Sequence, residues 1–145
     1  MSIIKDIFDI AKGGTIQGAK LAAIKRALRT ELKLNRQFLK DIELSNPIDN
    51  ERRKTIINML DITELSAAVK YDLPYQLICR KKVDVALAKT FHIKRLEGFD
   101  FEMLVESLYL KISYLKKDYH NDTIDLNLRL INIYKYNRVL IALLS

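Results

Sequence analysis

Hydrophobic positions recur with helical spacing over one long stretch, residues 15 to 44. At about 100° per residue its apolar side chains fall in one arc, formed by Leu21, Ile24, Leu28, Leu32, Leu39 and Ile42, with Ala27, Leu34 and Phe38 beside them. The opposite arc is cationic and consists of Lys25, Arg26, Arg29, Lys33, Arg36 and Lys40. No acidic residue falls within this cationic row before Glu43. The pattern predicts one long helix with a side for the core and a basic side.

A shorter amphipathic pattern precedes this stretch, in residues 1–13. Ser2 is placed to cap a short helix, and Gly13 and Gly14 are placed to end it. Such a helix gains order only by packing on something else. It could dock on its own domain, pack on a second copy of the chain, or lie on a membrane.

Helical signals continue in the second half of the chain. Residues 46–47, an Asn-Pro pair, predict the start of a third helix. Asp61 and Glu64 have the spacing of a capping box that would begin a fourth. A fifth helix is predicted from about Pro74 to Phe91, although its apolar positions are poorly sorted to one side. Hydrophobic residues then recur every three or four positions from Phe101 to Leu115.

The last stretch, residues 123–144, is ambiguous in its periodicity. Ile124, Leu126 and Leu128 alternate with polar residues, which is typical of a strand. The stretch is nevertheless too long for a single strand and contains neither glycine nor proline. A helix that is apolar on most sides and buried among others fits better, and Asp122 is placed to cap it.

These elements predict an all-α fold, an irregular bundle of about five to seven helices in a single domain over residues 15–145, preceded by the helix in residues 1–13. With 145 residues and 49% hydrophobic content, the chain is long enough to bury a substantial core without disulfide or metal support. The residues expected at the centre of that core are Leu21, Leu28, Leu104, Leu108, Ile112 and Leu115.

The net charge of +7 is unevenly distributed. The excess of cations lies in the long basic helix and in residues 73–99, where Arg80, Lys81 and Lys82 could extend the same patch. The chain is also rich in isoleucine, lysine, asparagine and tyrosine, whose codons are A/T-rich. That composition suggests a low-GC genome or an acquired element, which would fit an accessory component of a mobile-element or defence locus.

The sequence lacks the signals that usually identify several classes of protein. The single Cys79 cannot form an internal disulfide, and no paired cysteine and histidine spacing indicates a metal or other cofactor. No apolar run is long enough to span a bilayer, and the N-terminus lacks the features of a secretory signal. We therefore expect a cytoplasmic protein with no membrane span and no cofactor.

The candidates for catalysis are the two histidines, His92 and His120. Neither follows the arginine that small helical ribonucleases place shortly before a catalytic histidine, and neither belongs to a Glu-x-x-His metal motif. Both are expected at helix ends, where a partly charged imidazole meets the helix dipole. A ribonuclease-like enzyme using His92 or His120 is thus the weakest of the functional alternatives.

Two polar residues, Glu31 and Asn35, point into the apolar arc of the long helix, one turn apart. A buried carboxylate must find a partner or shift its pKa. One interpretation has Glu31 reach a lysine or arginine of a packed helix while Asn35 bonds a neighbour. The other has the two residues line a polar pocket between helices.

The sequence as a whole favours binding over catalysis. The basic helix side from Arg26 to Lys40 could bind an acidic protein partner or a second subunit in a homo-oligomer. The alternative is nucleic acid, whose phosphates could follow the same row of charges. Residues 134–138, Tyr-Lys-Tyr-Asn-Arg, interleave aromatic and basic side chains as single-strand binders do.

Overall fold

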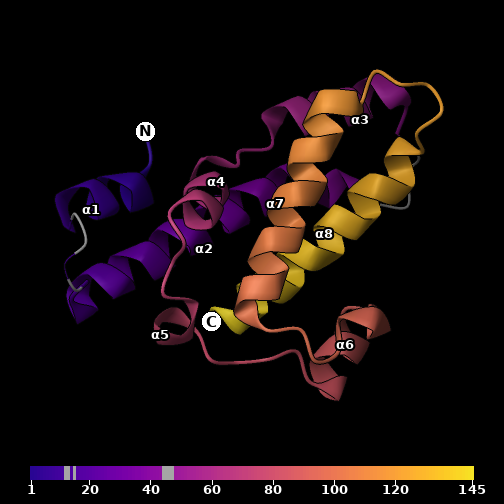
Figure 1. Ribbon diagram of the computed structural model, residues 1–145. Helices are drawn as coiled ribbons and strands as arrows, with labels where there is room; N and C mark the ends of the chain where they lie inside the picture. The colour runs from indigo at the N-terminus through magenta and orange to yellow at the C-terminus, as the bar shows by residue number, and fades with distance from the viewer. Residues whose placement is uncertain (12–13, 15, 44–47) are drawn as a thin grey trace.

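The computed structural model describes residues 1–11, 14, 16–43 and 48–145, and over these residues the chain is helical with no strand longer than an isolated bridge. The predicted all-α fold is therefore confirmed, with eight α-helices in the described residues where five to seven were expected. In chain order (Figure 1) they are α1 (Ile3–Ala11), α2 (Gly18–Glu43), α3 (Asn50–Met59), α4 (Thr63–Lys70), α5 (Tyr75–Ile78), α6 (Val85–Thr90), the 3-10 helix η1 (Lys94–Leu96), α7 (Phe101–Asp118) and α8 (Leu126–Leu143).

The long helix predicted over residues 15–44 is α2, which runs without a break from Gly18 to Glu43. Thr15 and Leu44, the expected ends, lie outside the described residues. Side chains of its apolar arc are fully buried, including Leu28 and Leu32. Leu21, expected at the centre of the core, is only half-buried because it belongs to the N-terminal part of α2, which extends past the end of α8 (Figure 1).

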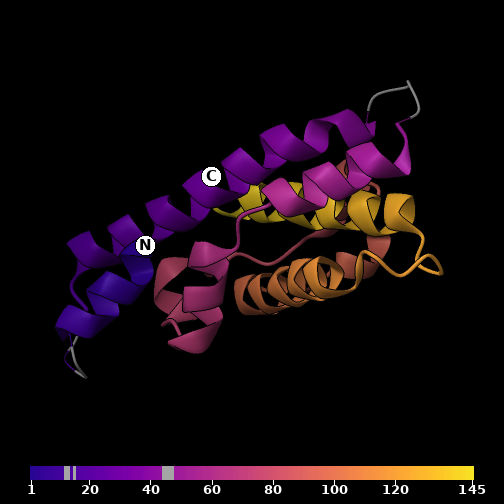
Figure 2. The ribbon, with the colours of Figure 1, turned by 90° about the horizontal axis from the view of Figure 1, so that it is seen from above.

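The helix α8 is the middle layer of the bundle. Figure 2 shows α2 and α7 on opposite sides of it, and α8 packs against both. This position explains its sequence, because a helix with neighbours on most sides is apolar on most sides. The helix preferred for residues 123–144 is thus confirmed, although its N-cap is Asp125, not Asp122. The other predicted core residues, Leu104, Leu108, Ile112 and Leu115, lie on the buried side of α7.

The single helix predicted from Pro74 to Phe91 is wrong. The chain forms two short helices, α5 and α6, separated by an extended segment. In that segment the backbone of Val83 donates to Phe99 at 2.9 Å and accepts from Gly98 at 2.8 Å. Asp84 then caps α6 by accepting from the backbone N–H of Leu87 at 2.7 Å. The poor sorting of apolar positions over this region reflects the interruption.

The predicted end of the first helix and the predicted start of the third are only partly tested. Gly13 and the 46–47 pair lie outside the described residues. The N-cap of α3 is Asp49, whose carboxylate accepts from the backbone N–H of Arg52 at 2.8 Å. Among the helices described, none combines the length and apolar character needed to cross a bilayer.

The packing of α2 against α8 predicts that alanine substitutions of two leucines on α2 lower the free energy of unfolding by very different amounts. Leu32 is fully buried, whereas Leu34 lies 46% exposed. Leu32→Ala should lower the free energy of unfolding by about 2–5 kcal/mol, because it leaves a cavity in the core. Leu34→Ala should lower it by less than about 1 kcal/mol. Urea denaturation of both variants measures this, and equal losses would contradict the described orientation of α2.

Candidate functional site

The six cations predicted on one side of the long helix lie on the side of α2 that faces away from the core. We call them the basic face: Lys25, Arg26, Arg29, Lys33, Arg36 and Lys40. Arg26, Lys33 and Lys40 are exposed, and the other three are half-buried along one edge. From Arg26 to Lys40 the row extends about 21 Å at ~1.5 Å per residue. The sequence pattern had predicted this separation of apolar and cationic sides.

The basic face is not neutralised by the described acids of the chain. The ion pairs between described side chains join Lys5 to Asp9, Arg52 to Asp41 and Lys54 to Glu51. Asp41 is itself a residue of α2, but its carboxylate accepts from Arg52 of α3 at 2.7 Å. The charges of the exposed cations Arg26, Lys33 and Lys40 are therefore available to another molecule.

Arg29 has a structural contact that the exposed cations do not share. Its Nη1 donates to the backbone oxygen of Leu144 at 3.3 Å, and Lys81 Nζ donates to the backbone oxygen of Ser145 at 2.9 Å. Both cations thus meet the C-terminal end of α8, where the helix dipole is negative. The structure brings Lys81 to the edge of the basic face through this shared end.

The neighbours of Lys81 are placed differently from one another. Arg80 is exposed and its Nε donates to the backbone oxygen of Gln76 at 3.3 Å. Lys82 is exposed and forms an isolated backbone bridge with Asp100. Neither Arg80 nor Lys82 hydrogen-bonds a described residue of α2, so among these three residues Lys81 is the one that meets the end of α8 beside Arg29.

Glu31 and Asn35 are both buried and hold the start of α4. The carboxylate of Glu31 accepts from the backbone N–H groups of Glu64 at 2.8 Å and Leu65 at 2.9 Å. These are first-turn N–H groups, which have no partner within their own helix. The expected lysine or arginine partner of Glu31 is thus wrong: the described partners are backbone N–H groups.

Asn35 bonds the residue that precedes this helix start. Its amide donates to the backbone oxygen of Asp61 at 2.7 Å and accepts from the backbone N–H of Asp61 at 2.9 Å. The capping box predicted from Asp61 and Glu64 is wrong, because the Glu64 carboxylate bonds α1 and the Asp61 carboxylate accepts from the backbone N–H of Thr63 at 2.9 Å, not from that of Glu64. The N–H groups of Glu64 and Leu65 are capped from α2.

The buried position of Glu31 changes its acidity. Burial raises its pKa from 4.5 to about 8, although the two backbone N–H donors oppose that effect, and the charges of Asp61 and Glu64 add to it. Glu31 therefore binds a proton more readily than an exposed glutamate does.

Glu64 of α4 caps the start of α1 in the way that Glu31 of α2 caps the start of α4. Its carboxylate accepts from the backbone N–H groups of Ile3 at 3.0 Å and Ile4 at 3.2 Å, and from the hydroxyl of Ser2. Ser2 accepts from the backbone N–H of Lys5 at 3.1 Å, as its predicted capping role requires. The helix α1 therefore docks on α2 and α4 of its own chain.

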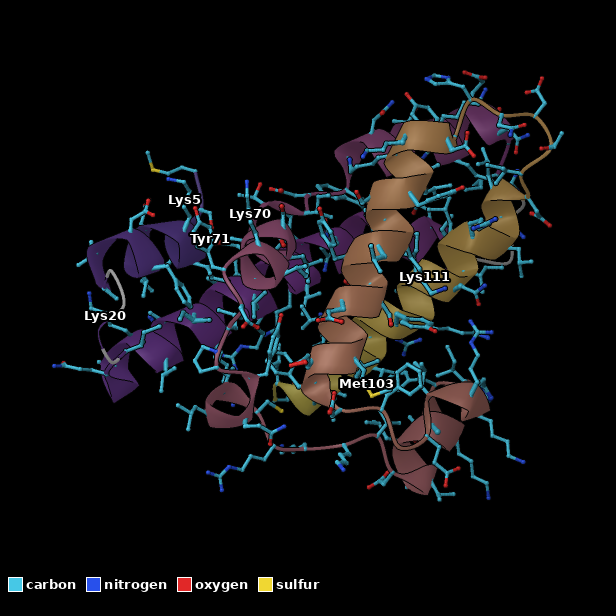
Figure 3. The ribbon with its side chains drawn as sticks, in the orientation of Figure 1. Lys5, Lys20, Lys70, Tyr71, Met103 and Lys111 are labelled. Atoms are coloured by element: carbon cyan, nitrogen blue, oxygen red, sulfur yellow. The ribbon has the colours of Figure 1, made fainter. Side chains whose placement is uncertain are left out.

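The opposite end of α4 contributes to the same docking. Figure 3 shows Tyr71, just after α4, beside α1. The ring of Tyr71 stacks on that of Phe8, with centroids 5.7 Å apart. The amphipathic helix predicted for residues 1–13 thus buries Ile4 and Ile7 against the bundle, whereas Ile3 and Ile10 stay 52% and 71% exposed.

A groove of about 380 Å³ separates α1 from α2 and the start of α4. Its lining includes Ile3, Ala23 and Leu34, together with Arg26 of the basic face. Glu31 and Asp61 are also among the lining residues, and hydrogen bonds from Thr63 lower the pKa of Asp61. The groove is therefore apolar in its walls, cationic near Arg26 and anionic near Asp61.

The two histidines are exposed. His120 follows α7 and its ring packs on that of Tyr119 at 3.9 Å between centroids. His92 follows α6 and lines hollows that also contain Lys89, Lys94 and Lys135. Among the described residues no group of three metal-ligating side chains exists. This geometry adds no support to the ribonuclease alternative.

The aromatic and basic segment at residues 134–138 is part of the core. Tyr134 and Tyr136 are buried, with 8% and 5% of their surface exposed. Lys111 Nζ lies 4.9 Å from the ring centre of Tyr136, and the Arg138 guanidinium lies 5.4 Å from that of Tyr134. Their positions do not provide the stacking platform that single-strand binders use.

Neither a protein-family model, nor a curated protein, nor a solved structure matches this chain. Sequence patterns identified the basic face but missed the groove and the role of Glu64, because the N–H groups that Glu64 caps lie about 60 residues away.

The raised pKa of Glu31 predicts a specific pH dependence of stability. Since its folded-state value of about 8 lies above the ordinary 4.5, folding takes up a proton between these values. The contribution of Glu31 to stability is thus fully present below about pH 4.5 and is lost as pH rises through about 8. Glu31→Gln, which cannot titrate, should show a flatter profile of unfolding free energy over this range. Parallel profiles for the two proteins would contradict the raised pKa.

The capping role of Glu64 predicts that its removal releases α1 locally. Glu64→Ala should increase hydrogen exchange in residues 3–11, because a lost helix cap costs about 0.5–2 kcal/mol. Mass spectrometry of N-terminal peptides measures the exchange. Glu51→Ala, which removes an exposed carboxylate of α3, is the control. Unchanged exchange in the Glu64 variant would show that α1 is held by other contacts alone.

Proposed function

We propose that this protein is a non-enzymatic interaction module whose basic face binds an acidic protein surface. The observation that carries the proposal is the row of exposed cations Arg26, Lys33 and Lys40, on an unbroken helix and without described acid partners. A row of one charge on a rigid element attracts an oppositely charged surface and orients it. Single exposed ion pairs contribute only about 0–1 kcal/mol each, so a partner must meet several cations at once.

The groove beside Arg26 favours a protein over a nucleic acid. Ile3 and Leu34, both about half exposed, offer apolar surface next to the cations. An amphipathic acidic helix could place an apolar side chain between them and a carboxylate on Arg26. Burial of apolar area then contributes about 25 cal/mol per Å². A phosphate backbone gains nothing from that surface and is repelled by Asp61.

Nucleic acid stays the alternative partner of the same face. The straight row of about 21 Å could contact successive phosphates. The two alternatives differ in what they require of the groove, because phosphate contacts need only the cations.

The basic face predicts that charge reversal abolishes binding to an acidic peptide. The triple variant Arg26→Glu, Lys33→Glu and Lys40→Glu changes exposed residues only and leaves Arg29 to stabilise the end of α8. The probe is a fluorescent helical peptide with leucines on one side and glutamates on the other, measured by anisotropy at low ionic strength. We expect at least about tenfold weaker binding, equivalent to ~1.4 kcal/mol.

The matched control reverses three exposed lysines elsewhere, Lys70, Lys89 and Lys94, and so changes the net charge equally. It should bind nearly as well as the wild type. Leu34→Ser should weaken binding of the peptide but not of nucleic acid.

The same titrations with duplex and single-stranded nucleic acid complete the test. Binding of nucleic acid alone, with a steep salt dependence that the triple variant loses, would replace the proposal with the phosphate alternative. Equal losses in the triple variant and its control would show that net charge acts without a specific face. Absence of binding to any probe would refute both.

A further inference from the structure

The outer side of α7 carries an apolar stripe that no part of the described chain covers. Met103, Leu110 and Tyr114 are 44%, 62% and 63% exposed, and with Ser107 they recur every three or four residues. We call these four residues the outer stripe. At about 100° per residue its centre lies about 130° around the helix from that of the buried side formed by Leu104, Leu108 and Ile112. Exposed apolar side chains that line one side of a helix are a candidate contact surface for another molecule.

Lys111 marks the boundary between the outer stripe and α8. Figure 3 shows its side chain leaving the middle of α7, with Met103 nearer the start of the helix. Lys111 Nζ lies over the ring of Tyr136 in α8, 4.9 Å from its centre. The stripe therefore faces away from α8.

Two exposed charges lie along the other edge of the outer stripe. Glu106 and Lys117 are eleven residues apart, or about three helical turns, so both point to the same edge. Neither forms an ion pair with a described residue. One edge of the stripe is thus acidic toward the start of α7 and basic toward its end.

We propose that the outer stripe is the interface of a homodimer in which α7 packs antiparallel on α7 of a second copy. A two-fold axis perpendicular to the helices brings the same edge of each copy together in opposite directions. With the axis near Ile112, Glu106 of each copy meets Lys117 of the other. The same register places Leu110 beside Tyr114 of the other copy.

The charges favour a second copy of the chain as the partner and antiparallel packing of the two α7 helices. In a parallel two-fold pair the edge with Glu106 and Lys117 would face the Lys111 edge of the other copy, so neither Glu106–Lys117 contact could form. The antiparallel pair forms both contacts, each between opposite charges. One helix pair buries less than the roughly 1,200 Å² of a standard interface, so we infer a weak dimer that forms as concentration rises.

The dimer would leave both basic faces free. Because α2 and α7 lie on opposite sides of α8 (Figure 2), pairing through α7 leaves the α2 of each copy on the outside. Such a dimer presents two copies of the basic face to a repetitive acidic partner, which raises the apparent affinity. The dimer itself does not depend on the proposed function of the basic face.

Sedimentation equilibrium over a wide concentration range tests the dimer. The wild-type mass should rise from the monomer value of 16.9 kDa toward twice that value. Leu110→Glu should stay monomeric at concentrations about a hundred times the wild-type dissociation constant. The control is Leu77→Glu, which charges an equally exposed leucine of α5 outside the stripe and should dimerise as the wild type does.

A charge exchange tests the direction of the helices. Glu106→Lys alone and Lys117→Glu alone should each weaken the dimer by about tenfold, because each substitution places like charges in contact at both of the symmetry-related 106–117 contacts. The double variant Glu106→Lys and Lys117→Glu should recover wild-type association. A wild type that stays monomeric, or a dimer that survives Leu110→Glu, would overturn the proposal. Failure of the double variant to recover would overturn the antiparallel arrangement.

Discussion

The arrangement of this bundle depends on one buried contact, the carboxylate of Glu31 on the N–H groups of Glu64 and Leu65. The helix α2 must bury its apolar side to be stable, and that side includes an ionisable group that burial penalises. Glu31 is accommodated because the start of α4 supplies two unpaired donors. Asn35, one turn later, bonds both backbone groups of Asp61. Together the two residues fix where α4 begins along α2, and the cations are left on the opposite, exposed side.

The same principle recurs between other helices. Glu64 caps α1 from α4, Arg29 meets the C-terminal end of α8 from α2, and Lys116 Nζ donates to the backbone oxygen of Ile57 at 2.9 Å near the end of α3. In each case the charge is opposite in sign to the helix end that it meets. Burial lowers the pKa of Lys116, as expected for a cation that is partly removed from water. Short helices that would be unstable alone are thus held by charged side chains of their neighbours, in addition to apolar packing.

Periodicity predicted the features that depend on one helix at a time: the extent of α2, its separation of apolar and cationic sides, the buried side of α7 and the helical state of α8. It failed where the partner is distant in sequence. The segment at Val83 is extended because it bonds Phe99 and Gly98, and no local pattern shows that pairing. Glu31 was identified as a buried polar residue, but a lysine or arginine was expected because ion pairing is the commoner partner for a carboxylate. The capping box at Asp61 and Glu64 marked the start of a helix correctly and assigned the wrong cap.

Amide hydrogen exchange at Glu64 and Leu65, followed by NMR, is the most direct measurement of the central contact. First-turn N–H groups of a helix ordinarily exchange fast, because they have no partner within the helix. If Glu31 caps them in the core, both amides should be protected nearly as strongly as those of Leu28 and Leu32, and Glu31→Ala should remove that protection first. Fast exchange at Glu64 and Leu65 in the wild-type protein would show that α2 does not hold the start of α4, and the account given for the bundle would be wrong.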